Sequence, residues 1–285
     1  MPRSTSNRHH AFSSAAQTLA DYREHNAPDP GSRHDPFAYA LQALSVGVFF
    51  GGGLLLTFLW PLVRWSLGEA HCAKYGSLVL QRLFRLFSAV LQRLGLFRVN
   101  WPDAHVLAGL RGTVVVANHP GLLDAVFLLS ELPRAVCVMQ ASLTRNPAFS
   151  GAAQLAGYIR NDQGAEMIRE CVRKLQAGDN LLIFPEGTRT RHPEGVINRF
   201  KAGFALAAVC GGAEVLTVFI EQSRSYLTHG MRVLEPVPVP VVLNIKLGEA
   251  FFPASGESAR DFAERVEGYY IRTLSAPVQS GKGAS

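Results

Sequence analysis

Signatures of several common catalytic and metal sites are missing from this chain of 285 residues. Its four cysteines form no C-x-x-C pair and show no metal-ligand spacing, so we expect reduced, mostly buried thiols, which suits the cytoplasm. The nine histidines include no H-E-x-x-H motif, and we expect no metal site. No G-x-S-x-G turn is present, which disfavours a hydrolase with a serine nucleophile.

Charged side chains are missing altogether from residues 36–63, a stretch long enough to cross a bilayer, which needs about 20 apolar residues. Three glycines (51–53) interrupt the run, Gln42 and Ser45 are polar within it, and Pro61 is expected to end it. We therefore expect a membrane-associated segment that either spans the bilayer or inserts partway as a re-entrant helix. A buried core helix is the third alternative.

The first 35 residues also lack the short basic region and the immediate apolar core of a signal peptide. They combine four Arg and four acidic residues with many Ser, His and Pro, and this composition predicts a polar, flexible tail. At the other end, residues 277–285 are predicted to be a disordered tail.

Positive charge is in excess, and the excess is local. The net charge is +6, and residues 64–100 hold six Lys or Arg against one Glu. A basic patch beside an apolar segment favours an anionic membrane surface and keeps the main domain on the cytoplasmic face. Nucleic acid is the competing partner, but no nucleic-acid-binding motif accompanies the patch and Leu and Phe are interleaved with it, so we expect none.

Residues 77–97 have the pattern of a basic amphipathic helix, with apolar residues at helical spacing and Arg82, Arg85 and Arg93 on much of the remaining surface. This helix either packs against the main domain or lies in the membrane interface beside the apolar segment. We therefore assign residues 36–100 to a membrane-associated helical region.

From residue 112 onward, apolar strand patterns alternate with helical patterns. This alternation predicts an α/β domain over residues 101–276, in which a mixed sheet core is flanked by helices. The expected strands are 113–117, 135–140, 180–184 and 214–220, followed by an extended stretch over 233–247. The expected helices are 147–156, 164–177 (capped by Asn161 or Asp162, with a Glu170–Lys174 pair), 201–210 and 257–274.

The strongest site candidate follows the first of these strands. The loop that starts at Asn118 and His119 is followed by Asp124 at the beginning of an apolar helical run. Five residues along one helix would point the two side chains about 140° apart, but a loop followed by a first turn can bring them together. A histidine held by a carboxylate has the arrangement of a general base. The alternative is that both are ordinary loop and helix-start residues.

A second loop repeats this design. The strand that ends at Phe184 is followed by Glu186, Gly187, Thr188 and Arg189. Loops at strand ends that gather polar groups are where α/β sheets commonly place their sites.

The two motifs, NHPGLLD and then FPEGTRT some sixty residues later, resemble the N-H-x-x-x-x-D and F-P-E-G-T-R-S patterns of the glycerol-phosphate and lysophospholipid acyltransferase superfamily. The resemblance covers roughly residues 70 to 250. It implies a membrane-bound enzyme that moves a fatty acyl group from acyl-CoA or acyl carrier protein to lysophosphatidic acid, with the lipid bilayer as a partner and no cofactor.

The resemblance also implies roles for individual residues. His119 would be the general base and Asp124 would orient it. The candidate substrate-binding residues are Asn118, Glu186, Gly187, Thr188, Arg189, Arg160 and Lys201. Because neither motif contains a Ser or Cys nucleophile, we expect direct transfer without an acyl-enzyme. Backbone N–H groups near residues 120–122 or at Gly187 are candidates to bind the oxyanion.

Two departures from the family pattern loosen the identity of the acceptor. Gln140 begins a segment where family members often have Lys, and Arg160 stands three positions earlier than the family's Arg. A non-glycerophosphate amphiphile, such as an amino-acid lipid or a polyketide-like pigment lipid, is therefore the alternative acceptor. A lipid-binding protein without catalysis is the alternative from another functional class.

Overall fold

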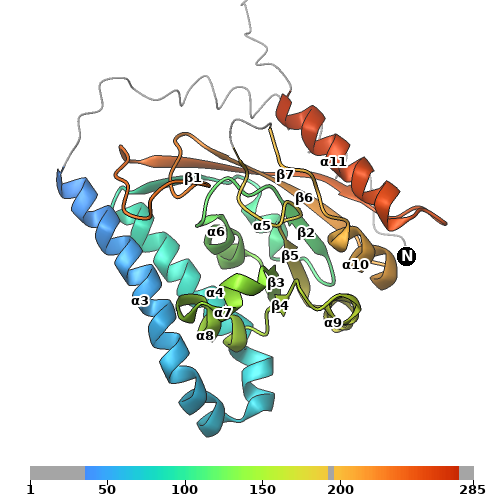
Figure 1. The fold of residues 1–285 in the computed structure, drawn as a ribbon, viewed down its shortest axis with the longest axis horizontal. Helices are drawn as coiled ribbons and strands as arrows, with labels where there is room; N and C mark the ends of the chain where they lie inside the picture. The colour runs from blue at the N-terminus through green and yellow to red at the C-terminus, as the bar shows by residue number, and fades with distance from the viewer. Residues whose placement is uncertain (1–35, 192–195, 276–285) are drawn as a thin grey trace, which may run out of the picture.

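The computed structural model describes residues 36–191 and 196–275 (Figure 1). The predicted tails, residues 1–35 and 277–285, lie outside the described residues. The described helices are α3 (Pro36–Leu67), α4 (Glu69–Arg93), α5 (Ala104–Leu107), α6 (Asp124–Glu131), α7 (Ala141–Arg145), α8 (Pro147–Leu155), α9 (Ala165–Gln176), α10 (Gly203–Gly211) and α11 (Ala259–Ser275). The described strands are β1 (Phe97–Asn100), β2 (Val114–Ala117), β3 (Ala135–Met139), β4 (Ile159–Arg160), β5 (Asn180–Ile183), β6 (Val215–Gln222) and β7 (Val241–Phe251).

All seven of these strands form one sheet in the order β1-β7-β6-β2-β5-β3-β4. The strands from β6 to β4 run parallel, whereas β7 is antiparallel to β6 and parallel to β1. The central strand β2 is flanked by β6 and β5, so the loops that follow β2 and β5 leave the sheet at the same edge. The predicted mixed sheet flanked by helices is thus confirmed.

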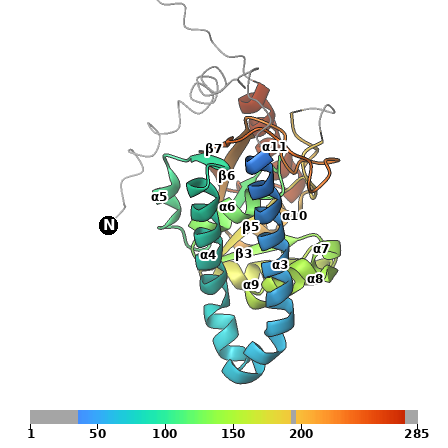
Figure 2. The same cartoon turned by 90° about the vertical axis from the view of Figure 1, so that its left-hand side faces the viewer.

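Both faces of the sheet are buried. Along β2, Val115 and Ala117 pack into a core with α6, while Val114 and Val116 pack into a second core with α10 and α11. A short strand buried on both faces needs a continuous β-branched run, as residues 113–116 supply. The helices on the two faces are visible in Figures 1 and 2, where α4 and α6 lie on one side of the sheet and α10 and α11 lie on the other.

The sheet begins earlier in the chain than the sequence pattern indicates. Helix α4 ends at Arg93, and Phe97 starts β1, which pairs in parallel with β7. A turn at Gly95 with φ of 70° separates the helix from the strand. The predicted amphipathic helix over 77–97 is therefore too long at its end, and the expected domain start at 101 leaves β1 on the wrong side.

The apolar segment forms one unbroken helix. Helix α3 continues through the three glycines and through Pro61 to Leu67, so Pro61 does not end it. A Cβ on Gly53 would lie 1.9 Å from the carbonyl oxygen of Ala148, which shows that a glycine here permits close packing of α3 on α8. Among the described helices, α3 alone is long and apolar enough to cross a membrane, with a mean hydropathy of 2.0.

The N-terminal cap of α9 differs from the expectation. Gly164 occupies the cap position instead of Asn161 or Asp162. The side chain of Asn161 accepts a hydrogen bond from Ala141 N, and that of Asp162 pairs with Arg160.

Glu170 pairs with Arg173 instead of Lys174. The extended stretch becomes a strand only at Val241, which pairs with Phe97 of β1, and pairing with β6 begins at Leu243 opposite Gln222.

Candidate active site

The loop after β2 is fastened to the neighbouring strand by Asn118. Its side-chain amide donates to Ile220 O at 2.8 Å, and its side-chain oxygen accepts from Ile220 N at 2.8 Å. Both groups of the buried amide are thus used inside the protein. Asn118, predicted to bind substrate, is placed instead as an anchor that fixes where the following residue, His119, leaves the sheet.

His119 and Asp124 lie in contact, as the loop followed by a first helical turn allows. The ring nitrogen Nδ1 of His119 is 3.1 Å from Oδ2 of Asp124, which is fully buried. Because a carboxylate only accepts hydrogen bonds, Nδ1 carries the proton of the neutral ring and Nε2 is left as an acceptor. The ring also stacks on Phe184 with centroids 4.0 Å apart, so its orientation is fixed from two sides.

Two further donors hold the Asp124 carboxylate. Gly121 N donates to Oδ2 at 2.7 Å, and Gln222 Nε2 donates to Oδ1 at 3.2 Å. A Cβ on Gly121 would lie 2.0 Å from Gln222 Nε2, so a glycine is needed for this close approach. Gln222 lies at the end of β6, and no motif signal in the sequence connects it with the first loop.

Glu186 joins the two motif loops from inside. Its Oε1 accepts hydrogen bonds from His119 N at 2.9 Å and from the Thr190 hydroxyl at 2.8 Å, and its Oε2 accepts from Asn198 N at 2.8 Å. Burial raises the pKa of this carboxyl, and these three hydrogen bonds oppose the shift. The residue does not line the cavity described below, so its predicted contact with substrate is replaced by a connection between loops.

Of the three cationic residues predicted to bind substrate, two line the cavity and one does not. Arg189 and Lys201 both line the cavity, and a Cβ on Gly187 would lie 2.7 Å from Lys201 Nζ. One Arg189 nitrogen donates to the carbonyls of Leu227 and Thr228, and burial lowers the pKa of this guanidinium.

Arg160 lies elsewhere. It is paired with Asp162 at 2.7 Å and is not among the residues that line the cavity. Its predicted contact with an anionic head group is therefore not supported by its position.

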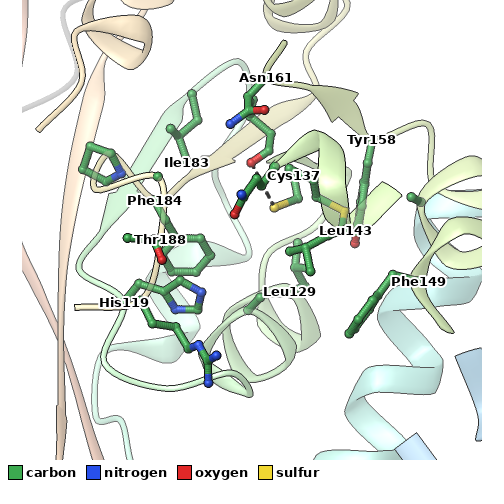
Figure 3. Close-up of a pocket in the computed structure, with 18 of the residues that line it drawn as sticks. His119, Leu129, Cys137, Leu143, Phe149, Tyr158, Asn161, Ile183, Phe184 and Thr188 are labelled. Atoms are coloured by element: carbon green, nitrogen blue, oxygen red, sulfur yellow. Dashed lines mark hydrogen bonds between the residues drawn. The ribbon is translucent and has the colours of Figure 1, made fainter. Parts of the chain in front are cut away.

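The backbone N–H groups expected to bind an oxyanion are already used within the protein. Gly121 N donates to Asp124, Leu122 N donates to Leu227 O at 3.1 Å, and Gly187 N donates to Phe184 O at 3.0 Å. That expectation is therefore wrong for these groups. In contrast, no described residue forms a hydrogen bond with the hydroxyl of Thr188, which lines the cavity at the same end as His119 (Figure 3).

The cavity itself has a volume of about 370 Å³ and extends from the catalytic-type residues into an apolar interior (Figure 3). One end carries His119, Thr188, Arg189 and Lys201. The other end is closed by aromatic and aliphatic side chains from α3, α4, α6, α7 and α8, namely Phe49, Phe84, Leu129, Leu143 and Phe149. A polar end that opens into an apolar interior suits a ligand with a reactive polar group and a long apolar chain.

Comparison with protein families matches residues 98–221 to the family described as Acyltransferase. The crystal structure of PlsC from Thermotoga maritima, titled 1-acyl-sn-glycerophosphate (LPA) acyltransferase, shares the fold with a TM-score of 0.58 and 21% sequence identity. The match covers 82% of this chain and 98% of that one.

Two curated relatives are similar over part of their length. The 1-acyl-sn-glycerol-3-phosphate acyltransferase of Helicobacter pylori is 31% identical over 101 residues, which cover 33% of this chain and 42% of the relative. Glycerol-3-phosphate acyltransferase 1 of Arabidopsis thaliana is 28% identical over 178 residues, 58% of this chain and 29% of the relative. The chain thus spans less than half the length of these relatives.

Proposed function

We propose that the chain is a member of the 1-acyl-sn-glycerol-3-phosphate acyltransferase superfamily and that it transfers a fatty acyl group from a thioester to the free hydroxyl of lysophosphatidic acid. The observation that carries this proposal is the contact of His119 with a fully buried Asp124 at the polar end of an apolar cavity. The arrangement offers a base, an anion-binding end and room for an acyl chain.

In this mechanism Nε2 of His119 removes the proton from the acceptor hydroxyl as its oxygen attacks the thioester carbonyl. Asp124 stabilises the imidazolium that forms, and Gly121 N and Gln222 keep the carboxylate in place. Collapse of the tetrahedral intermediate breaks the carbon–sulfur bond, and the imidazolium returns its proton to the thiolate. No covalent acyl-enzyme is formed in this sequence.

We assign the oxyanion to the hydroxyl of Thr188. This side chain lines the cavity beside His119 and has no hydrogen-bond partner within the described part of the chain. A donor positioned before the reaction stabilises developing negative charge at little reorganisation cost.

The acceptor phosphate belongs at Lys201 and Arg189. The ammonium of Lys201 forms no ion pair with any residue that the structure describes, and the Arg189 guanidinium is half-buried at the cavity wall with one nitrogen held by backbone carbonyls. An Arg fixed in this way presents its remaining N–H groups to a phosphate without losing side-chain entropy on binding. The donor's acyl chain then occupies the apolar interior.

We propose that the α3–α4 hairpin inserts into one membrane leaflet instead of spanning the bilayer. Helix α3 is attached to the main domain at Gln42, whose amide bonds Val237, and again at Thr57, which accepts from Gly151 N. Only the ten residues from Phe58 to Leu67 lie beyond the second attachment, and they extend about 15 Å at 1.5 Å per residue. The hydrocarbon core is about 30 Å thick, so this length reaches roughly its middle.

The exposed surface of the hairpin suits such an insertion. Phe58, Leu62 and Trp65 are exposed near its tip, Trp65 by 83%. In inverted vesicles, an N-terminal tag and the catalytic domain should then be digested from the same side. Digestion of the two from opposite sides would show that α3 spans the membrane.

The decisive experiment combines membranes that contain the full chain with lysophosphatidic acid and labelled palmitoyl-CoA or palmitoyl carrier protein. We expect labelled phosphatidic acid, and we expect His119→Ala to abolish it. His105→Ala is the matched control, because His105 is an exposed residue of α5 that does not line the cavity. Loss of activity in both variants, or in neither, would contradict the assigned role of His119.

The position of Arg160 favours one further candidate acceptor. Because its guanidinium is engaged by Asp162 away from the cavity, it offers nothing to a glycerol phosphate head group there. An amphiphile other than a glycerophosphate is the alternative acceptor. Product formation from such an amphiphile, with none from lysophosphatidic acid, would establish it.

A further inference from the structure

A tyrosine hydroxyl lies beside the apolar side chains that line the inner part of the cavity. The phenol ring of Tyr158 lines the cavity on the side away from His119, and Figure 3 shows its hydroxyl directed inward, toward Leu143 and Phe149. No described residue forms a hydrogen bond with this hydroxyl. Because this hydroxyl is not among the fully buried polar atoms of the described residues, it faces the open space of the cavity, and an apolar ligand that fills this space would remove it from water without giving it a partner.

The surroundings of the hydroxyl keep it protonated and leave its proton available to a ligand. Burial raises the pKa of Tyr158 well above its usual value, and the nearby Cys137 adds to the shift, so the phenol stays protonated and can donate. Cys137 offers no strong acceptor, because its own thiol donates weakly to Val138 O at 3.8 Å. A phenylalanine would fill the same space but would offer no hydrogen-bond donor to a ligand in the cavity.

The sheet order indicates where along an acyl chain this hydroxyl would act. His119 follows β2, and Tyr158 directly precedes β4, which is three strands away in the order β2-β5-β3-β4. Neighbouring strands lie about 4.8 Å apart, so β4 is about 14 Å from β2. An extended acyl chain advances about 1.2 Å per bond, so a distance of about 14 Å corresponds to about twelve bonds from the thioester carbonyl. Because the Tyr158 side chain points back into the cavity, its hydroxyl should meet the acyl chain roughly eight to twelve bonds from that carbonyl.

We propose that Tyr158 selects acyl donors that carry a hydroxyl or carbonyl oxygen near the middle of the chain, to which its phenol donates a hydrogen bond. This inference rests on the proposed acyl transfer and adds a substrate class to it. Chains oxygenated at C3 are not the target, since C3 lies only two bonds from the carbonyl, beside His119. A plain chain leaves the phenol unpaired and is therefore used less well.

Internal competition between two donors provides the test. The full chain in lipid vesicles receives lysophosphatidic acid with an equimolar mixture of stearoyl-CoA and 12-hydroxystearoyl-CoA, then with the 10-hydroxy and 3-hydroxy isomers. We expect the 10- or 12-hydroxy donor to be preferred by about fivefold, the value of one neutral hydrogen bond, and Tyr158→Phe to bring that ratio close to one. The ratio is unaffected by any loss of folded enzyme, because both donors compete for the same molecules.

Phe149→Leu is the matched control. It enlarges the same cavity without changing its polar groups, so it should alter the use of both donors alike and leave the ratio in place. A wild-type protein without preference for mid-chain oxygenation, or a preference that persists in Tyr158→Phe, would overturn the proposal. So would a preference for the 3-hydroxy isomer that is independent of Tyr158.

A binding measurement separates this proposal from the proposed reaction. Calorimetry compares the affinities of 12-hydroxystearic acid and stearic acid for the wild-type protein and for Tyr158→Phe, and it needs no catalysis. If no acyl group reaches lysophosphatidic acid, the proposed acceptor fails, while the affinity ratio still tests the phenol. We expect a ratio of about five that falls to one in the variant, and equal affinities in the wild type would refute the role of Tyr158.

Discussion

Replacement of Asp124 by Asn removes one charge from the site and should leave its hydrogen bonds intact. The Asn oxygen can take the position of Oδ2 and accept from Gly121 N and from His119 Nδ1. The new amide group then faces Gln222, whose Oε1 has no hydrogen-bond partner among the described residues. A flip of the Gln222 amide would pair the two groups, so the variant should fold with nearly the wild-type stability.

The expected loss of rate follows from the distance between the charges. An imidazolium and a carboxylate 3.1 Å apart attract each other by about 5 kcal/mol at an effective dielectric constant near 20. The Asn oxygen retains a hydrogen bond worth about 1–1.5 kcal/mol. The difference, about 3–4 kcal/mol, is stabilisation that only the protonated histidine of the transition state receives, and it corresponds to a loss of about 10²–10³ in kcat.

The assay compares kcat and thermal unfolding for D124N, D124A, H119A and the double variant H119A/D124N. We expect D124A to lose stability as well as activity, because it leaves Gly121 N and Gln222 without their buried acceptor. The double variant should be no slower than H119A alone, since the two side chains act as a unit. A D124N enzyme within threefold of wild-type kcat, or fully additive losses in the double variant, would refute the assigned roles.

Three further outcomes are expected. Gln222→Leu should lower kcat about tenfold with the fold retained by circular dichroism, since one hydrogen bond to a charged carboxylate is lost; an unchanged kcat would remove Gln222 from the site. Thr188→Val should lower kcat about 10²-fold and Thr188→Ser should restore most of it, whereas equal activities would exclude the hydroxyl as oxyanion donor. Thiol titration at pH 8 should modify the exposed Cys210 first, because burial raises the pKa of the Cys137 thiol to about 12. In the unfolded chain the same thiol ionises near pH 9, so the folded state is favoured as long as Cys137 is protonated in both states. Urea unfolding should therefore show this contribution to stability being lost as the pH rises from about 9 to 12.

The sequence was most informative where the chain itself brings groups together. A β-branched run predicts a strand buried on both faces, and the strand found over Val114–Ala117 lies at the centre of the sheet. His119 and Asp124 are five residues apart across one loop, so their contact depends on local geometry alone. The polar residues after β5 were found by the same reasoning, since parallel neighbours release their loops at one edge.

Side chains whose function depends on tertiary contacts could not be predicted. Gln222 reaches Asp124 from 98 positions along the chain, and Tyr158 enters the cavity because β4 pairs beside β3. The role of Glu186 was misjudged for a related reason. A motif shows that a carboxylate is present but not whether it faces substrate or, as here, three donors of the surrounding loops.

The separation into a membrane-associated region and a catalytic domain does not hold at the cavity. Phe49 of α3 and Phe84 of α4 line the cavity that His119 lines, and Phe49 lies 6.0 Å from Phe149 of α8 between ring centroids. The hairpin thus uses its inner surface to complete the cavity while its outer surface exposes apolar side chains such as Trp65. Because one pair of helices has both surfaces, the proposed insertion of the hairpin into a leaflet would bring a lipid from the membrane to the wall of the cavity before it met bulk water. This arrangement gives a physical reason why the apolar helix is attached along the domain instead of being tethered to it by a linker.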